Sequence, residues 1–361
     1  MSSNVAKLAR RRLAHLPTPL EELKTLSAKL GGPRLLIKRD DQTGLALGGN
    51  EVRKLEFLVA DALAQNADTL VTLGAAQSNH CRQTAAAAAA CGLQCELILN
   101  GENPEMPQGN RLLDELFGAK IHWIEHSQRA AKSREVMEQL RAAGRKPYLI
   151  PLGGSNGVGA LGYVTAITEL IEQLQNERVN RIVFASSSGG TQAGMVVGAR
   201  ANEFAAEVMG IRIDKDERNA AVYEEELSEI ANDAATRLGI KERFTANDFK
   251  VMRGYAETGY GVVGDLEREA IRTLAQTEGI LLDPLYRPRF WRVARFSPAK
   301  NYWSERNNSL LAHRRDACIV CLRQRLDRLM RAERLALRPL IRDATHLRGQ
   351  GIASFVFGRL I

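Results

Sequence analysis

The stretch that decides the fold runs from Arg181 to Gly194 and reads RIVFASSSGGTQAG. An apolar run of strand type ends in serines and glycines, and a helical pattern of small residues follows. Backbone N–H groups in such a turn, together with the positive end of the helix dipole, suit a bound phosphate. The turn lacks the lysine and the spacing of common nucleotide-binding motifs, so a tight turn without a ligand is the alternative.

The same alternation of strand and helix continues on both sides of this turn, as far as about residue 286. Further runs of strand type lie at residues 34–40, 69–74, 94–99, 120–125, 146–154 and 207–214. This pattern predicts an α/β fold with a mostly parallel sheet and helices on both faces. Sites in such folds lie beyond the carboxyl ends of the strands, so the turns there are candidate site segments.

Length and composition fit an ordinary globular protein. The chain has 361 residues, of which 45% are hydrophobic and 25% charged, so we expect one large or two modest domains. No apolar run is long enough for a membrane span. The N-terminus is basic but lacks the apolar region of a secretory signal, which leaves a transit peptide as the weaker alternative. Five cysteines suit a reducing compartment, so we expect a cytoplasmic protein.

The net charge of +8 is unevenly distributed. Residues 287–361 hold 16 Arg, one Lys and five acidic residues, a net charge of +12, whereas residues 1–286 carry a net charge of −4. A basic tail is compatible with nucleic-acid binding. The alternative is that the tail is not native sequence.

A second turn, GAAQSNHCRQ at residues 74–83, also follows a strand. Ser78 and Asn79 suit the cap of the next helix, and Ser78 could also serve as nucleophile or proton donor. For His80 we favour a structural hydrogen-bonding role, with a direct catalytic role as the alternative. Two further tyrosines, Tyr260 in GYGV and Tyr286 in DPLY, stand beside turn residues, where each could pack or face a substrate.

The cysteines carry no clear chemistry. Cys318 and Cys321 resemble half of a metal site, but the sequence has no second pair of this spacing, so we predict no metal. Cys81, Cys91 and Cys95 stand in no pattern that indicates a nucleophile, and we interpret them as small packing residues.

The segment GGNEVRKLEF at residues 48–57 predicts a loop that leads into a helix, with Asn50 as the cap. Glu51 then occupies an early helical position, and Lys54 follows about one turn later.

Six ordered motifs over residues 8–286 together resemble the D-cysteine desulfhydrase and 1-aminocyclopropane-1-carboxylate deaminase family. They are KRDDQTGLALGGN with RKLEFLVADAL, GAAQSNHCRQTAA, GALGYVTA, SSSGGTQAG, GYGV and EGILLDPLY. The resemblance implies an enzyme that uses pyridoxal 5′-phosphate and has the two-domain fold of the tryptophan synthase β type. It also implies a homodimer. The expected large domain spans 1–54 and 165–286, and the small domain spans 55–164.

The resemblance implies roles for individual residues. The cofactor phosphate would bind at Ser187, Ser188, Gly189, Gly190 and Thr191. Asn79 would contact the ring hydroxyl, and Asn50 would also lie at the cofactor. Ser78, Tyr260 and Tyr286 would face a small amino-acid substrate. The implied reaction converts D-cysteine to pyruvate, ammonia and sulfide, with L-cysteate and 1-aminocyclopropane-1-carboxylate as alternative substrates.

The chain departs from this family at residue 51. The resemblance places there the lysine that forms a Schiff base with the cofactor, but the residue is Glu51, and a carboxylate cannot form that bond. Lys54 could substitute weakly, because it lies about 4.5 Å further along the same helix; Lys38, on a strand, is a weaker candidate. The alternatives are binding without a covalent link and a catalytically dead, pseudogene-like relative.

The chain also departs from the family after Tyr286. The family continues with Thr-Gly-Lys/Arg-Ala and later with His-Thr-Gly-Gly-x-Pro-Ala-Leu-Phe-Ala, neither of which is present. Codons that encode YRPRFWR (286–292) and AHRRDACIVCL (312–322) can be chosen so that, one base later, they read TGRAFG and HTGGTPALFA. Both occur in the same frame and in the expected order. We therefore predict a frameshift near codon 286 and a non-native tail from about Arg287, which explains the excess of arginine without a nucleic-acid partner.

Overall fold

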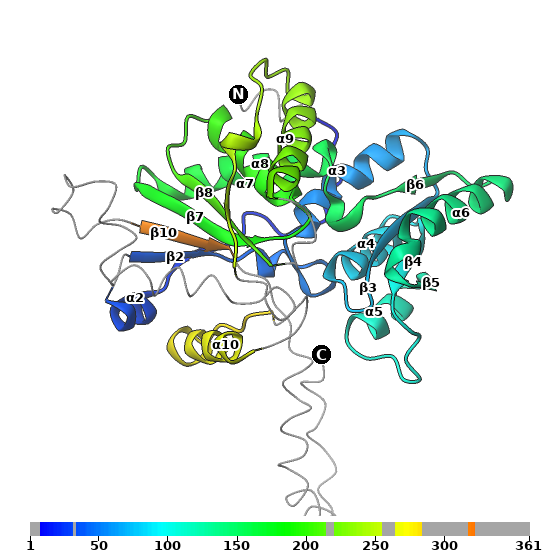
Figure 1. The fold of residues 1–361 in the computed structure, drawn as a ribbon, viewed down its shortest axis with the longest axis horizontal. Helices are drawn as coiled ribbons and strands as arrows, with labels where there is room; N and C mark the ends of the chain where they lie inside the picture. The colour runs from blue at the N-terminus through cyan, green and yellow to red at the C-terminus, as the bar shows by residue number, and fades with distance from the viewer. Residues whose placement is uncertain (1–7, 32–33, 214–219, 255–263, 284–316, 322–361) are drawn as a thin grey trace, which may run out of the picture. The chain divides into compact units, whose positions relative to one another are not determined.

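The computed structural model describes residues 8–31, 34–213, 220–254, 264–283 and 317–321, which contain two β-sheets (Figure 1). The first sheet has six strands in the order β1-β2-β10-β7-β8-β9. Only β1 pairs in antiparallel fashion within the described part of this sheet. The strands are β1 (Leu20–Glu22), β2 (Arg34–Lys38), β7 (Val179–Ser186), β8 (Glu207–Arg212), β9 (Lys250–Met252) and β10 (Ala317–Cys321).

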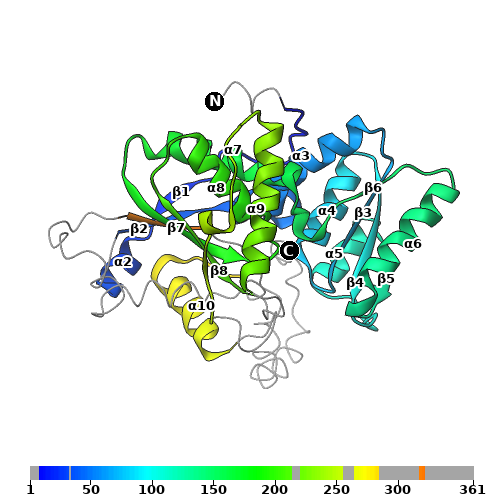
Figure 2. The same ribbon diagram turned by 45° about the horizontal axis from the view of Figure 1, so that its top comes forward.

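Alternating side chains of this sheet enter two different cores. On β2, Leu36 packs in the larger core, whereas Leu35 and Ile37 pack in the smaller one, as the period of two in a strand requires. Helices α7 (Gly157–Leu174), α8 (Gly190–Ala201) and α9 (Ala220–Arg237) line the larger core, and α2 (Lys24–Leu30) and α10 (Asp265–Glu278) line the smaller one (Figures 1 and 2). The helices therefore cover both faces of the sheet.

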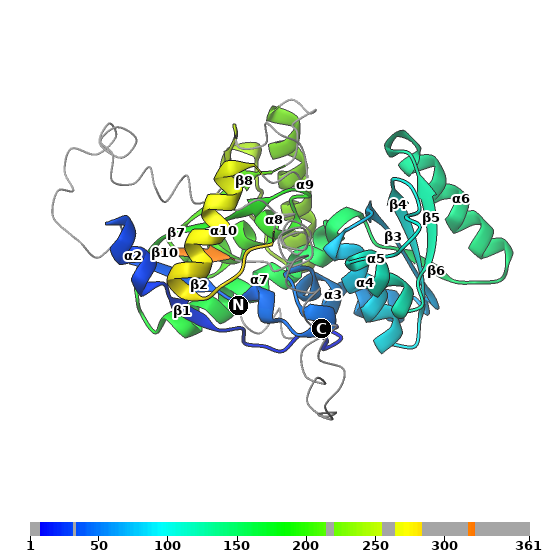
Figure 3. The ribbon, with the colours of Figure 1, turned by 90° about the horizontal axis from the view of Figure 1, so that it is seen from below.

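The second sheet has four parallel strands in the order β5-β4-β3-β6. Its faces are covered by α6 (Arg129–Ala142) on one side and by α4 (Asn79–Ala90) on the other (Figure 3). Alanines at positions 85–88 of α4 are buried and allow close packing against the strands. The strands are β3 (Thr69–Ala75), β4 (Gln94–Asn100), β5 (Lys120–Ile124) and β6 (Pro147–Leu149).

Helix α3 (Glu51–Ala64) packs against α7, which covers the six-stranded sheet, and against α4, which covers the four-stranded sheet. Its residues from Glu51 to Ala60 are all buried. The remaining elements are α5 (Asn110–Leu116) and five short 3-10 helices: η1 (Asp40–Gln42), η2 (Leu45–Leu47), η3 (His126–Gln128), η4 (Leu152–Gly154) and η5 (Ala246–Asp248). None of the helices in the described ranges is both long and apolar enough to cross a bilayer.

The predicted α/β class is confirmed, and a strand occurs in each run that the sequence marked as strand-like. Of the tail from Arg287 onward, only β10 lies among the described residues, where it pairs in parallel with β2 and β7. A frameshift concerns the coding DNA, so that explanation of the tail stays a prediction. The domain boundaries near residues 54 and 164 also stay predictions.

Candidate active site

The start of α3 is tied directly to the serine- and glycine-rich turn after β7. Asn50 stands at the cap position, but its side chain does not make the predicted cap bond. Its backbone is already helical, with φ −65° and ψ −25°, whereas a capping residue is normally extended. The Asn50 Nδ2 atom instead donates to Thr191 Oγ1 at 3.1 Å. The predicted cap position of Asn50 is confirmed, but its side chain makes no cap bond, and the amide instead links two segments of the site.

The two glycines before Asn50 fix the shape of this loop. Gly48 and Gly49 have φ values of 74° and 135°. Residues that carry a Cβ atom rarely adopt such positive φ values. A Cβ on Gly49 would lie 2.4 Å from the Nε2 atom of Gln83. Thr43 Oγ1 bonds both the N–H and the carbonyl of Gly49 at 2.8 Å, and Arg82 donates to the carbonyl of Gly48 at 2.8 Å. The loop is therefore held rigidly where it delivers residue 51.

Glu51 is buried, with only 2% of its surface exposed. The wholly buried Gln83 of α4 donates from Nε2 to Glu51 Oε2 at 3.1 Å. Within the described ranges, the Oε1 atom of Gln83 and the Oδ1 atom of Asn50 are buried and accept no hydrogen bond. Acceptor oxygens of three neighbouring side chains, Glu51, Gln83 and Asn50, therefore lie at the start of α3.

Lys54 is also buried, but its amine is engaged elsewhere. Its Nζ donates to the carbonyl oxygen of Gly153 at 3.0 Å, and burial lowers the pKa of this amine to about 7. Gly153 lies against the turn after β7, since a Cβ on Gly153 would lie 2.2 Å from Ser188 Oγ. The Lys54 amine is therefore bonded to a residue that packs against this turn.

The turn after β7 has the features of an anion site. Gly189 has a φ of 90° and precedes α8, whose 12 residues give it a positive N-terminal end. Ser155 Oγ donates to Ser188 Oγ at 2.8 Å and accepts from the Gly190 N–H at 3.0 Å. The side chains of Ser187, Ser188 and Thr191 are half-buried. These groups could hold a phosphate.

The turn after β3 is built around Ser78 and Asn79. Ser78 accepts from the Cys81 N–H at 3.2 Å and caps α4, as its position predicted. Asn79 donates to Asp283 and accepts from Asn110 Nδ2 at 2.9 Å. Both polar atoms of the Asn79 side chain thus take part in a buried network, and its contact with a cofactor ring stays a prediction.

His80 has a structural environment. Its Nε2 lies 2.9 Å from Thr72 Oγ1, which donates to the Ile150 carbonyl at 2.9 Å. The threonine hydroxyl therefore accepts from a neutral ring. Burial, and then the charge of Lys54, lower the pKa of His80 to about 3, so the ring stays uncharged near neutral pH.

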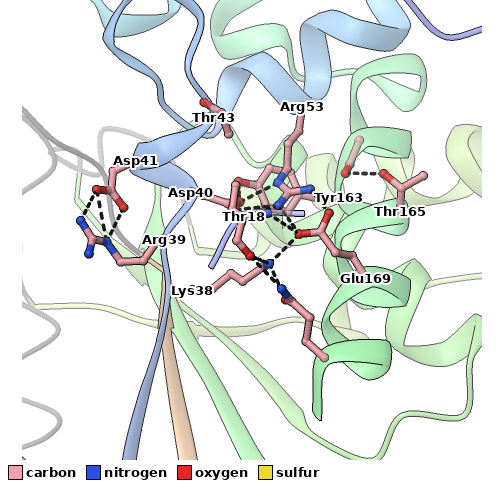
Figure 4. Close-up of polar contacts among 12 residues, drawn as sticks. Thr18, Lys38, Arg39, Asp40, Asp41, Thr43, Arg53, Tyr163, Thr165 and Glu169 are labelled. Carbon is pink, nitrogen blue, oxygen red and sulfur yellow. Dashed lines mark hydrogen bonds and ion pairs between the residues drawn. The ribbon is translucent and has the colours of Figure 1, made fainter. Parts of the chain in front are cut away.

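A buried ionic cluster fixes α3, and sequence reasoning missed it (Figure 4). Arg53 is 1% exposed and donates to Asp40 at 2.8 and 2.9 Å and to Glu169 at 2.8 and 3.0 Å. Thr18 and Tyr163 also bond Asp40. Burial alone would raise the pKa of Asp40, but Arg53 outweighs it and holds that pKa below its ordinary value. The cluster orients the helix that carries residues 51 and 54 and that follows Asn50 directly.

The same cluster accounts for Lys38, the weaker candidate for a substitute lysine. Its amine bonds Glu169 and Gln173 and the carbonyl of Thr18 (Figure 4). Its bonds therefore serve the cluster and not the loop at residue 51. The charges of the segment KRDD are visible in the sequence, but Lys38 has partners 131 and 135 positions away, so the sequence offered no signal for the pairing.

The structure assigns no site role to the remaining candidate residues. Tyr260 and Tyr286 lie outside the described residues. Cys81 and Cys95 are buried thiols whose pKa values are raised mainly by burial, which makes them poor nucleophiles. Cys91 is partly buried and free.

The fold and the two turns together define the class. The chain belongs to the pyridoxal-phosphate dependent enzyme family, which matches residues 11–286. It is 41% identical over 292 residues to the D-cysteine desulfhydrase of Klebsiella pneumoniae strain 342, a match that covers 78% of this chain and 86% of that protein. The enzyme of a second K. pneumoniae strain, MGH 78578, matches equally.

Solved structures agree with this assignment. A homologue of 1-aminocyclopropane-1-carboxylate deaminase superposes with a TM-score of 0.76 at 33% identity, and the match covers 89% of this chain and 93% of that one. Maize serine racemase gives a TM-score of 0.63 at 14% identity, over 90% of this chain and 93% of that one, and supports the fold alone. The chain is thus a D-cysteine desulfhydrase homologue with the tryptophan synthase β-type fold.

The residues present fit the phosphate of this family's cofactor but not a covalent bond to its carbonyl carbon. The half-buried hydroxyls and N–H groups at the start of α8 suit its phosphate. Glu51 does not suit a covalent bond to its carbonyl carbon, because a carboxylate is not the amine that this chemistry needs. A covalently held cofactor therefore does not fit at residue 51.

Proposed function

We propose that the chain is a D-cysteine desulfhydrase-type lyase that binds pyridoxal 5′-phosphate without a covalent bond and turns over substrate poorly. The parent reaction consumes D-cysteine and water and yields pyruvate, ammonia and sulfide. The observation that carries the proposal is the buried Glu51 at the first position of α3, with the nearby Lys54 amine bonded to the Gly153 carbonyl. The 41% identity to a D-cysteine desulfhydrase supports the substrate class.

The phosphate would lie at the Ser187–Thr191 turn. The start of α8 supplies N–H groups, and Ser188 and Thr191 supply hydroxyls. Lys54, bonded to Gly153 beside the same turn, adds a positive charge when an anion binds, because a nearby anion favours the charged form of a lysine. When bound, the cofactor supplies a ring that stabilises a carbanion next to a substrate carboxylate.

Substrate would be handled from the turn after β3. Ser78 accepts from the Cys81 N–H, and its own O–H can still donate to, or exchange a proton with, a substrate atom. We propose this role for Ser78, and a substrate-facing role for Tyr260 and Tyr286, on the resemblance to the family. A relative that binds the cofactor and has lost turnover is the second candidate, favoured by the same buried Glu51.

The test uses the full-length chain and pyridoxal 5′-phosphate. We expect saturable binding that inorganic phosphate weakens and that dialysis reverses. Borohydride should leave no adduct on any lysine, and sulfide release from D-cysteine should be slow. A borohydride-fixed adduct on Lys54 with rapid sulfide release would contradict non-covalent binding. Absence of any binding would overturn the cofactor site itself.

We also propose that the tail from about Arg287 is read out of frame and that an in-frame parent forms a homodimer. In support, the family match ends at residue 286, where the arginine-rich segment begins. Sequencing the coding DNA tests the first point, since a one-base change near codon 286 should open a frame that encodes HTGGTPALFA. Sedimentation of the frame-corrected chain tests the second.

A further inference from the structure

We propose that the loop at the start of α3 selects a vitamer that carries an amine, pyridoxamine 5′-phosphate, over the aldehyde and alcohol forms. This inference rests on the proposed cofactor site, and it concerns the ring substituent next to the phosphate arm. It follows from the disagreement between Glu51 and a covalent link. The consequence is a binding preference, with no bond made or broken.

Hydrogen-bond chemistry supports an amine. Three side chains present acceptor oxygens at this loop: the carboxylate of Glu51, Gln83 Oε1 and Asn50 Oδ1. Gln83 is wholly buried, and its Oε1 accepts no bond in the described part of the chain. A buried acceptor without a donor is costly, so the loop is complementary to a ligand rich in N–H donors.

Position supports the same conclusion. The bond of 3.1 Å between Asn50 Nδ2 and Thr191 Oγ1 places the loop beside the phosphate turn. A small ring whose phosphate arm occupies that turn therefore has the neighbouring ring substituent, which differs among the three vitamers, within reach of residues 50 and 51. A glutamate is about one bond shorter than a lysine, so a hydrogen bond of about 2.8 Å from Glu51 reaches the place that a lysine nitrogen would otherwise fill.

Charge distinguishes the vitamers. The amine of pyridoxamine phosphate resembles that of lysine, whose ordinary pKa is about 10.4, so it is protonated at neutral pH and can pair with Glu51. The aldehyde oxygen of pyridoxal phosphate can only accept and would face other acceptors. The hydroxymethyl group of pyridoxine phosphate can donate once but is neutral. Lys54, bonded to Gly153 beside the proposed phosphate turn, and Glu51 at the loop would then match the two charged groups of the amine form.

The experiment titrates the full-length chain with the three phosphorylated vitamers by isothermal calorimetry at one pH. We expect pyridoxamine phosphate to bind about tenfold more tightly than pyridoxine phosphate, the difference expected from one charge-assisted hydrogen bond. Glu51→Gln should remove most of this preference. Thr191→Val should weaken all three ligands to a similar degree, because it acts at the phosphate.

The outcomes separate this inference from the proposed function. Equal affinities for the three vitamers, or tighter binding of the aldehyde form, would overturn the amine preference and leave the cofactor site intact. A preference that persists in Glu51→Gln would also overturn it. Failure of all three vitamers to bind a folded chain would overturn the proposed function. Circular dichroism of each variant checks that the fold is retained.

Discussion

The Nζ atom of Lys54 lies 3.0 Å from the carbonyl oxygen of Gly153. Gly153 packs against Ser188 of the phosphate turn, whereas Glu51, three positions earlier on α3, contacts Gln83. Side chains three positions apart are neighbours on the surface of a helix, but here they make contacts in different directions. The amine is thus held in a bond that it would have to leave in order to replace the missing lysine.

Burial of Lys54 gives the stability of the ligand-free chain a pH dependence. Its pKa is about 7 in the folded chain, against the ordinary 10.5, so between these values the unfolded chain binds more protons. Stability must therefore rise with pH across this window, by up to about 1.4 kcal/mol per pH unit from this group. Lys54→Met should lack this rise and should gain most on wild type below pH 7. Urea unfolding at several pH values measures it.

The exposed Lys24 on α2 offers a matched control for that series. Lys24→Met should keep the wild-type dependence on pH. If Lys54→Met and wild type show parallel stability between pH 7 and 10, the buried amine does not titrate as its surroundings imply.

The hydroxyl of Thr191 joins the α3 loop to the proposed phosphate turn at residues 187–191. Thr191→Val keeps the side-chain volume but removes this hydroxyl, so we expect phosphorylated ligands to bind about 5- to 10-fold more weakly, as for one lost hydrogen bond. Thr165→Val is the control, since the Thr165 hydroxyl bonds Gly162 within α7. Calorimetric titration with pyridoxine phosphate compares them. Equal affinities in the two variants would argue against a phosphate at this turn.

Replacing Arg53 should lower the free energy of unfolding by more than an ordinary surface substitution does. Arg53→Met leaves the buried Asp40 without its main cation, which costs about 3–5 kcal/mol in comparable buried pairs. Arg237→Ala on α9 breaks a pair whose side chains are more than 40% exposed, and should cost less than about 1 kcal/mol. Urea unfolding gives both values. Similar losses would mean that the cluster does not stabilise α3.

Local features of this fold could be predicted from the sequence, and long-range pairings could not. The apolar runs in RLLIKRD (34–40) and TLVTLG (69–74) predicted β2 and β3, because strand patterning depends on neighbouring residues. Ser78 was recognised as a helix cap for the same reason. Asn50 was expected to cap in the same way, but its amide bonds Thr191, 141 positions away. Such a partner is set by tertiary packing.

The candidate site shows the same division. The change at Glu51 could be recognised in the sequence, because residue type alone decides whether an amine is present. The direction of Lys54 could not, because it depends on Gly153, 99 positions away. The Arg53 cluster draws on Thr18, Asp40 and Glu169, which share no sequence pattern. Burial of all these charges became visible only in three dimensions.

We propose that the carboxylate of Glu51 alone prevents a covalent link that the rest of the site would support. Glu51→Lys supplies the amine, and Glu51→Gln removes the charge without supplying one. Each full-length variant is mixed with pyridoxal 5′-phosphate, reduced with borohydride and analysed by peptide mass spectrometry. We predict an adduct at residue 51 in Glu51→Lys alone, with sulfide release from D-cysteine raised by at least about 10²-fold. An adduct on Lys54 of the unaltered chain, or no adduct in a folded Glu51→Lys variant that binds the cofactor, would contradict this role of Glu51.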